Sequence, residues 1–318
     1  MKTTVVCAAL SLGLLFSGIS TASAQSPPAD VYKQAQALIE KHDYKGAIAI
    51  LDAYISNHPA EAKYLVLRGD AKDDIGDHIG ALIDYDAAIH INPEYEYAYA
   101  TRAGTEVEMG HYDAGVADAT KAIALTSDDD AAYRTRAIAY MNLDKLDAAL
   151  ADAEKAVTID KSNSYNLSTR CRAHRNLKQY DLAISDCTTA ITLDATNDSA
   201  FYARGMAYIG ESSWGNAIGD FRKALQIDDT NTNAFYWIAM SEYQQQQYAQ
   251  ALTDANAYIK TADRDGDGFL LRAKIELKQG NSAGARTDAT EALRLYHIQA
   301  DDTSAKDAQD FLDSLGKP

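Results

Sequence analysis

The chain has 318 residues, with 30 Lys and Arg against 46 Asp and Glu, and a formal net charge of −16. Its 47% hydrophobic and 24% charged residues are typical of a chain that buries a core, which excludes disorder for most of its length. The surplus of acids repels phosphate backbones, so no nucleic acid is expected as a partner. Only five prolines occur, which favours long helices over a loop-rich fold.

Residues 1–24 have the pattern of a secretory signal peptide. Lys2 precedes an apolar run over Val5–Ile19, and a small-x-small motif ends at Ala24. The run is shorter than the ~20 residues that a membrane span needs, so an uncleaved anchor is the weaker interpretation. We therefore expect an exported chain, periplasmic or secreted, that is not embedded in a membrane after cleavage.

From residue 28 on, small residues recur every 34 positions without insertion or deletion. The first series is Ala47, Ala81, Gly115, Ala149, Ala183, Ala217, Ala251 and Ala285. The second lies twelve residues earlier and is Ala35, Gly69, Ala103, Ala137, Cys171, Gly205, Ala239 and Ala273. The third lies seven residues later and is small except for Tyr54 and Tyr258. Apolar residues within each period have helical spacing, and turn pairs such as Gly76-Asp77 divide it, so each period predicts two helices.

Small residues where two antiparallel helices cross allow the two backbones to approach closely. One helical hairpin cannot bury both of its faces, so eight hairpins are expected to stack into a solenoid with a continuous core. The expected repeats are 28–61, 62–95, 96–129, 130–163, 164–197, 198–231, 232–265 and 266–299. In the remaining segment, 300–318, apolar residues at helical spacing within Ser304–Leu315 predict a C-terminal capping helix.

This pattern resembles the tetratricopeptide repeat (TPR). With Ala47 counted as position 20, positions 8, 20 and 27 are small, position 24 is large in Tyr85 and Phe221, and position 32 is proline in Pro59 and Pro93. The sequence departs from the family pattern where position 32 is not proline after the second repeat, and where position 27 is Tyr in the first and seventh. The resemblance implies an all-α solenoid, a right-handed superhelix whose first helices line a concave groove.

The resemblance also implies that positions 2, 5, 9, 12 and 13 of each first helix face the groove. Arginines and tyrosines concentrate at these positions in repeats four to seven, and such side chains are frequent anchors of protein interfaces. The candidate groove residues are Tyr97, Arg134, Asn142, Tyr165, Arg172, Arg175, Asn176, Tyr202, Tyr236 and Tyr243.

The implied function is a non-enzymatic scaffold of the cell envelope that binds an extended peptide or a protein in the concave groove. A module that binds polysaccharide or cell-wall material is the alternative, because tyrosines can stack on sugar faces. An assembly subunit that uses its convex face is a third possibility, and the tyrosines and arginines could also form an ordinary solvated inner face.

A charge pair repeats with the 34-residue period. Position 7 is arginine in Arg68, Arg102, Arg136, Arg170, Arg204 and Arg272. Position 23 is aspartate in Asp84, Asp118, Asp152, Asp186, Asp220, Asp254 and Asp288. The two positions lie at similar distances from the turn, so they can face each other. A set that recurs in six repeats indicates structural ion pairs rather than a series of catalytic or metal-binding carboxylates.

Cys171 and Cys187 occupy positions 8 and 24 of the fifth repeat and are expected to lie opposite each other on its two helices. Because an exported chain meets an oxidising compartment, the sequence predicts a disulfide between them. The alternative is a pair of small apolar core residues.

The loop between repeats seven and eight resembles the start of an EF-hand. Asp263, Asp265 and Asp267 alternate and Gly268 follows, which is the spacing that wraps a hard cation such as calcium. The twelfth residue, however, is Lys274 where a bidentate glutamate is required. The alternative is a helix cap made by the same acidic turn.

No catalytic motif is present. The seven histidines form no H-E-x-x-H pair, and neither G-x-S-x-G nor a phosphate-binding glycine loop occurs. We therefore expect neither an enzyme nor a bound cofactor.

Overall fold

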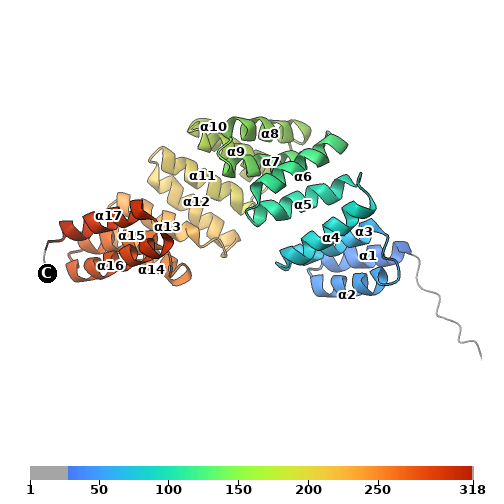
Figure 1. The fold of residues 1–318 in the computed structure, drawn as a ribbon. Coiled ribbons are helices and arrows are strands. Elements are labelled where there is room, and N and C mark those ends of the chain that lie inside the picture. Colours follow the sequence, from blue (N-terminus) through green and yellow to red (C-terminus); the bar gives the residue numbers. More distant parts are fainter. Residues whose placement is uncertain (1–27, 317–318) are drawn as a thin grey trace, which may run out of the picture.

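The computed structural model describes residues 28–316, and the expected signal peptide at 1–24 lies outside them. In the described chain, seventeen helices form eight antiparallel hairpins followed by a single helix (Figure 1). Their bounds are α1 Pro28–Ile39, α2 Tyr44–Ile55, α3 Ala62–Asp73, α4 His78–Ile91, α5 Glu96–Glu108, α6 Tyr112–Leu125, α7 Asp130–Asn142, α8 Leu146–Ile159, α9 Ser164–Asn176, α10 Tyr180–Leu193, α11 Asp198–Gly210, α12 Trp214–Ile227, α13 Asn233–Gln244, α14 Tyr248–Thr261, α15 Gly266–Lys278, α16 Ser282–Gln299 and α17 Asp302–Ser314.

The hairpins stack in chain order into an arc (Figure 1). Each second helix packs on the first helix of the next repeat. The first helices α5, α7, α9 and α11 also contact one another in succession, whereas successive second helices in the described chain lack comparable contacts. The first helices therefore lie on the tighter, inner side of the arc. The all-α solenoid predicted from the 34-residue period is confirmed.

Within each hairpin, positions 8 and 24 face each other, and glycine at position 8 accompanies a large ring at position 24. Gly69 lies under the buried ring of Tyr85, and Gly205 lies under that of Phe221. A Cβ atom added to Gly205 would lie 2.8 Å from Phe221 Cε1, so only glycine fits beneath the ring. Four other repeats place two buried alanines at the same positions: Ala103 and Ala119, Ala137 and Ala153, Ala239 and Ala255, Ala273 and Ala289.

The fifth repeat fills these positions with Cys171 and Cys187, which are bonded to each other with a Cα–Cα distance of 5.5 Å. Both cysteines are fully buried among alanines, including Ala183 and Ala203. The disulfide therefore ties the two helices of the central hairpin at the point where other repeats rely on small-residue contact.

We expect the double variant Cys171→Ala, Cys187→Ala to fold, because it recreates the alanine pairs of other repeats. It should lose the chain-entropy stabilisation of the disulfide, about 3 kcal/mol at most for so short a loop. Thermal unfolding with and without reductant tests this: the wild-type midpoint should fall with reductant and that of the variant should not move. An unchanged wild-type midpoint in the presence of reductant would contradict a stabilising disulfide.

The repeated arginine and aspartate form ion pairs, as the spacing indicates. Arg136 Nε and Nη2 donate to Asp152 at 2.7 and 2.9 Å, and its Nη1 donates to Thr120 of the preceding repeat at 3.0 Å. Arg68, Arg102, Arg204 and Arg272 are bonded in the same way to Asp52, Asp86, Thr188 and Asn256. Each of these arginines therefore connects the two helices of its own hairpin, and it also links that hairpin to the preceding one.

The C-terminal helix α17 caps the stack. Its residues Phe311 and Leu312, with Leu315 just beyond it, pack on the buried alanines Ala273 and Ala285 of the last repeat. The opposite face of α17 carries exposed acids, so it ends the apolar core with a polar surface. Within residues 28–316, no helix combines the length and the apolarity required to cross a membrane.

Candidate functional site

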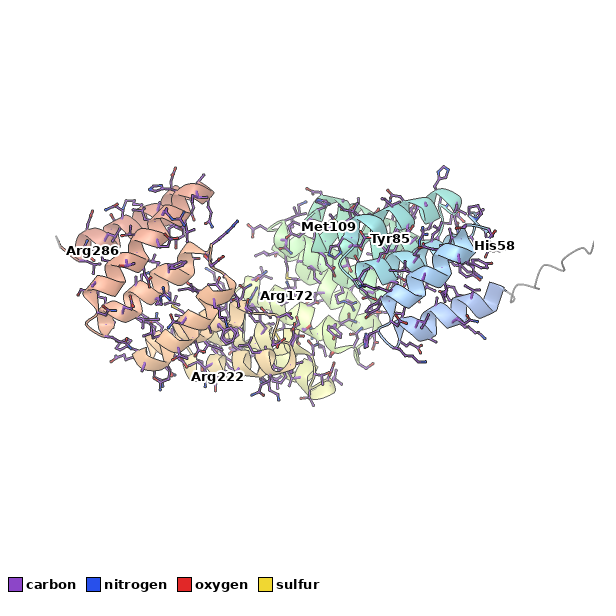
Figure 2. All side chains as sticks on the ribbon, turned by 90° about the horizontal axis from the view of Figure 1, so that it is seen from below. His58, Tyr85, Met109, Arg172, Arg222 and Arg286 are labelled. Carbon is purple, nitrogen blue, oxygen red and sulfur yellow. A yellow bond between two sulfur atoms is a disulfide. The ribbon has the colours of Figure 1, made fainter. Side chains whose placement is uncertain are left out.

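Two arginines on α9 lack the acidic partners that the position-7 arginines have. No carboxylate of the described chain forms an ion pair with Arg172 or Arg175, and the one side chain that accepts from Arg175 is Asn176. Burial lowers the pKa of both guanidinium groups, and the neighbouring charge of Arg175 lowers that of Arg172 further. Figure 2 places Arg172 near the middle of the molecule. Two partly desolvated positive charges therefore lie close together in an acidic protein, and no carboxylate in the described part of the chain pairs with them.

An aromatic row continues from these arginines along the next first helices. Tyr202 on α11 lies in the field of Arg172 and Arg175 and packs edge-on against Phe221. Tyr236 on α13 stacks edge-on against Trp237 at 5.1 Å between ring centroids. Tyr202, Tyr236 and Trp237 line a cavity of about 180 Å³. The inner face of repeats five to seven thus joins a cationic segment to an aromatic one.

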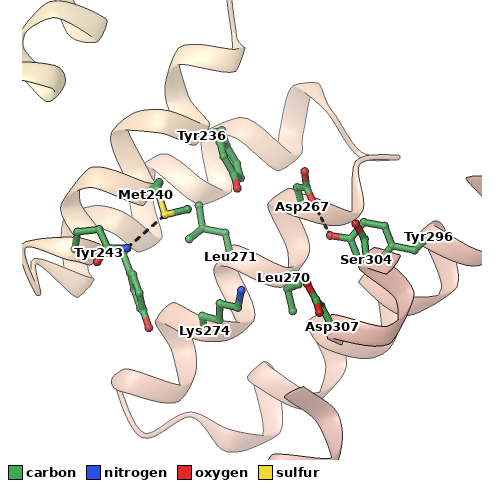
Figure 3. Close-up of a pocket in the computed structure, with 11 residues that line it drawn as sticks. Tyr236, Met240, Tyr243, Asp267, Leu270, Leu271, Lys274, Tyr296, Ser304 and Asp307 are labelled. Atoms are coloured by element: carbon green, nitrogen blue, oxygen red, sulfur yellow. Dashed lines mark hydrogen bonds between the residues drawn. The ribbon is translucent and has the colours of Figure 1, made fainter. Parts of the chain in front are cut away.

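A second cavity, of about 230 Å³, adjoins the first and shares Tyr236 and Asp267 with it (Figure 3). Tyr243 and Met240 of α13 form one side, and Lys274 of α15 projects into it. The opposite side comes from the last repeat and the cap. The lining of this cavity is Tyr236, Met240, Tyr243, Gln244, Asp267, Leu270, Leu271, Lys274, Tyr296, Ser304 and Asp307.

The N-terminal part of the inner surface is acidic instead. Asp70 on α3 accepts hydrogen bonds from Tyr85 and Tyr97 at 3.0 and 3.2 Å. Burial raises the pKa of Asp70 to about 6, although these two bonds favour its charged form. The concave face therefore changes from acidic in repeats two and three to basic in repeat five. Tyr97 is a predicted groove residue, but its hydroxyl is bonded to Asp70 within the protein.

Two further candidate residues are engaged within the chain. Arg134 donates to Asn166 at 3.1 Å and lies 3.8 Å from Asp130, so it braces the joint between repeats four and five. Asn142 donates to its own helix backbone. Arg134 is therefore a weaker candidate for ligand binding than its position in the repeat suggested, because its charge is already compensated.

The remaining candidates lie on the first helices α9, α11 and α13. Tyr165 is 50% exposed at the start of α9, on the same helix as Arg172 and Arg175. Tyr243 packs against Tyr248 at the rim of the second cavity. Of the ten predicted groove residues, the structure gathers six into one surface, which we call the central groove: Arg172, Arg175, Asn176, Tyr202, Tyr236 and Tyr243.

The acidic loop that resembles the start of an EF-hand makes contacts within the fold. Asp265 caps α15 by accepting from the backbone of Asp267, and its carboxylate also accepts from the hydroxyl of Tyr258. The Asp267 carboxylate accepts from Tyr296 at 2.6 Å (Figure 3). Asp263, Asp265 and Asp267 do not form a convergent ligand group in the described chain, so these contacts favour the helix-cap interpretation.

Repeat seven contains an acidic pair that the repeat pattern does not predict. Repeat seven has Ile238 at position 7, so Asp254 lacks the arginine that its counterparts have. Arg222 from repeat six takes the place of that arginine and forms ion pairs with Glu242 at 2.6 Å and with Asp254 at 3.6 Å. Burial, and then the charge of Asp254, raise the pKa of Glu242 to about 7. The absence of arginine from position 7 of repeat seven is the feature of the sequence that could have indicated this pair.

This pair predicts a pH dependence of stability. Glu242 binds its proton more tightly in the folded chain than in the unfolded one, where its pKa is about 4.3. Stability should therefore fall as the pH rises from about 4.3 to 7 and should change little from this source above that range. Urea unfolding at pH 5 and pH 8 tests this. Asp254→Asn should weaken the pH dependence, and an unchanged dependence in that variant would contradict the coupling.

The comparisons with known proteins agree with this architecture. A family model of the tetratricopeptide repeat matches residues 32–96, 101–164 and 236–304, which is more than half of the chain. The chain therefore belongs to the tetratricopeptide repeat family. Members of this family are generally non-enzymatic scaffolds that bind proteins or peptides. No curated protein matches the sequence.

Several solved structures share the fold. The Cut9–Hcn1 hetero-tetramer of the APC/C has a TM-score of 0.73 at 14% identity over 90% of this chain and 55% of that chain. A human IFIT1 dimer has a TM-score of 0.67 at 15% identity, over 92% and 74% of the two chains. A tetratricopeptide repeat protein from Parabacteroides merdae has a TM-score of 0.57 at 15% identity, over 80% and 99%. At such identities the likeness supports the solenoid fold alone.

Proposed function

We propose that this protein is a binding scaffold of the cell envelope whose central groove holds an acidic, extended segment of a partner protein. The observation that carries the proposal is the pair Arg172 and Arg175, which is partly desolvated and has no carboxylate partner among residues 28–316. Leaving such charges uncompensated costs stability, and a carboxylate from a ligand would offset that cost through charge-assisted hydrogen bonds. No catalytic step is part of the proposal.

The aromatic row supplies the rest of the site. Tyr202, Tyr236 and Trp237 provide large surfaces with few rotatable bonds, so they can cover apolar side chains that flank an acidic residue at little entropic cost. The two adjoining cavities offer places for individual side chains rather than room for a large rigid ligand. An extended peptide that runs from α9 toward α13 matches this order of charge and aromatic surface.

The test uses a fluorescein-labelled glutamate-rich peptide and fluorescence anisotropy. Arg172→Glu with Arg175→Glu should weaken binding about 100-fold or more, because each lost charge-assisted contact is worth about 1.5–3 kcal/mol. Lys155→Glu with Lys161→Glu is the matched control, since it makes the same change in net charge at exposed positions outside the groove. An equal loss in both variants would show that only net charge matters, and would contradict the proposal.

The same measurement separates the polysaccharide alternative. A glycan stacked on tyrosines should depend on Tyr202 and Tyr236 and be insensitive to the arginine double variant. Binding of cell-wall fragments that survives Arg172→Glu with Arg175→Glu, together with no binding of the acidic peptide, would favour that alternative.

The envelope location rests on the sequence pattern of residues 1–24. If it is correct, the protein isolated from a periplasmic fraction should begin at Gln25. An intact Met1 in protein from the producing cells' envelope would contradict export by cleavage.

A further inference from the structure

A second cluster of polar side chains lies away from the central groove, at the turn end of repeats two and three. Asp73 is the last residue of α3, His78 is the first residue of α4, and Glu108 is the last residue of α5. One ligand atom from each of the three lies within 4.8 Å of the others. His78 Nδ1 is 2.8 Å from Asp73 Oδ1. Three side chains from two repeats thus converge on one point.

The separations suit a single small ion. Two ligands that each lie about 2.0–2.2 Å from a tetrahedral zinc ion are about 3.4 Å apart. His78 and Asp73 are closer than this, and Glu108 is an exposed residue at a helix end with freedom to move the short distance needed. All three residues are at least partly accessible, so an ion can enter from solvent and keep water as a further ligand.

The local charge favours a cation. No Lys or Arg of the described chain forms an ion pair with Asp73 or Glu108, and the nearby Lys72 is taken by Asp84 at 2.8 Å. Both acids stand at helix C-termini, where the helix dipole is negative and acids are unfavourable. Among the residues that the structure describes, His78 is therefore the one basic side chain paired with this negative charge.

We propose that Asp73, His78 and Glu108 form a binding site for a divalent transition-metal ion of the Zn²⁺ class that links repeat two to repeat three. Imidazole nitrogen with carboxylate oxygen suits zinc better than calcium, which takes oxygen ligands in larger number. The first helices α3 and α5 contact each other less than those of the central repeats. A bound ion therefore adds a tie between hairpins where helix packing is sparse.

The next turn along the chain provides a natural control. Glu106 and His111 form a similar pair, 2.6 Å apart, between the end of α5 and the start of α6. The following repeat, however, has Asn142 where Glu108 stands, and the described chain shows no third ligand for this pair. In the described chain the second turn therefore offers a histidine–acid pair without a third carboxylate, one repeat position earlier than the pair of Asp73 and His78.

The experiment is isothermal titration of ZnCl₂ into the full chain, prepared without a histidine tag. The wild type should bind one ion, and His78→Gln and Glu108→Gln should each weaken binding about tenfold or more. His111→Gln should leave the affinity unchanged. Glu108 is exposed, so its variant should keep the wild-type circular dichroism even if His78→Gln does not.

Any of three results would overturn the proposal: no zinc binding by the wild type, equal affinity in Glu108→Gln, or an equal loss in His111→Gln. Calcium binding as tight as zinc binding would overturn the assignment to the transition metals. The site shares no residue with the central groove, so its failure would leave the proposed peptide binding untouched.

Discussion

Replacing Arg136 with methionine should lower the free energy of unfolding by about 3–5 kcal/mol, because it leaves the buried Asp152 carboxylate without its counter-charge. Asp152 accepts two hydrogen bonds from Arg136 and is only 11% exposed. The substitution also removes the bond to Thr120, which links two repeats. Urea unfolding of the full chain, followed by circular dichroism, measures the change.

Two controls distinguish the effect of breaking a buried ion pair from the effect of removing one positive charge. Arg294→Met removes an exposed partner of Glu291, and should cost less than about 1 kcal/mol. The double variant Arg136→Met, Asp152→Leu removes both charges and should recover much of the loss, since an apolar pair can replace a buried ion pair. A single variant as mild as Arg294→Met would show that the repeated pairs are not structural connectors.

Replacing Phe221 with alanine should cost about 3–5 kcal/mol, because the ring is fully buried and its loss leaves a cavity between α11 and α12. Adding a methyl group opposite, in Gly205→Ala, should cost about 1–3 kcal/mol by overpacking against the ring. The double variant recreates the alanine pairs found in four other repeats. It should therefore be more stable than Phe221→Ala alone, and urea unfolding of all three variants measures this coupling.

Gly219→Ala is the matched control, because it lies on the same helix α12 with nothing near its added Cβ atom. It should stabilise the protein by about 0.5–1 kcal/mol through helix propensity. Additive losses in the Gly205 and Phe221 double variant would contradict the idea that the residue at position 8 is fitted to the residue at position 24.

The repeat architecture was predictable because every 34-residue period has small residues at the same helix-crossing positions. Small residues at helix crossings, repeated at a constant 34-residue step, predict helical hairpins that stack on their neighbours. The arginine and aspartate at positions 7 and 23 were predictable for the same reason. The second partner of each arginine, such as Thr120 for Arg136, was not, because its position varies between acid, amide and hydroxyl from repeat to repeat.

The turns show a further limit of sequence patterns. Every hairpin turn has a residue with positive φ at position 15, but only three of the eight are glycine: Gly76, Gly110 and Gly280. The other five are His42, Asp144, Lys178, Ser212 and Gln246, with φ between 56° and 61°. Tight packing of the two helices imposes this backbone conformation, so a search for glycine finds only part of the turns.

The positions of the candidate groove residues could be predicted from the repeat, but the partners of their side chains could not. Arg134, Arg172 and Arg175 all occupy groove positions, but Arg134 lies 3.8 Å from Asp130 on its own helix and donates to Asn166 of the next repeat. The cluster of Asp73, His78 and Glu108 is likewise spread over three helix ends. Which charges remain unpaired depends on how the helix ends meet, and the repeat pattern does not specify that.

The most direct test of peptide binding in the central groove is site-specific photo-cross-linking in cells that produce the protein. The photoreactive residue replaces Tyr202 in the groove or, as a control, the exposed Leu182 on the second helix α10 of repeat five. Our account predicts cross-linked peptides rich in Asp and Glu at Tyr202, lost when Arg172→Glu and Arg175→Glu are added. The same peptides at both positions, or peptides without acids at Tyr202, would contradict it.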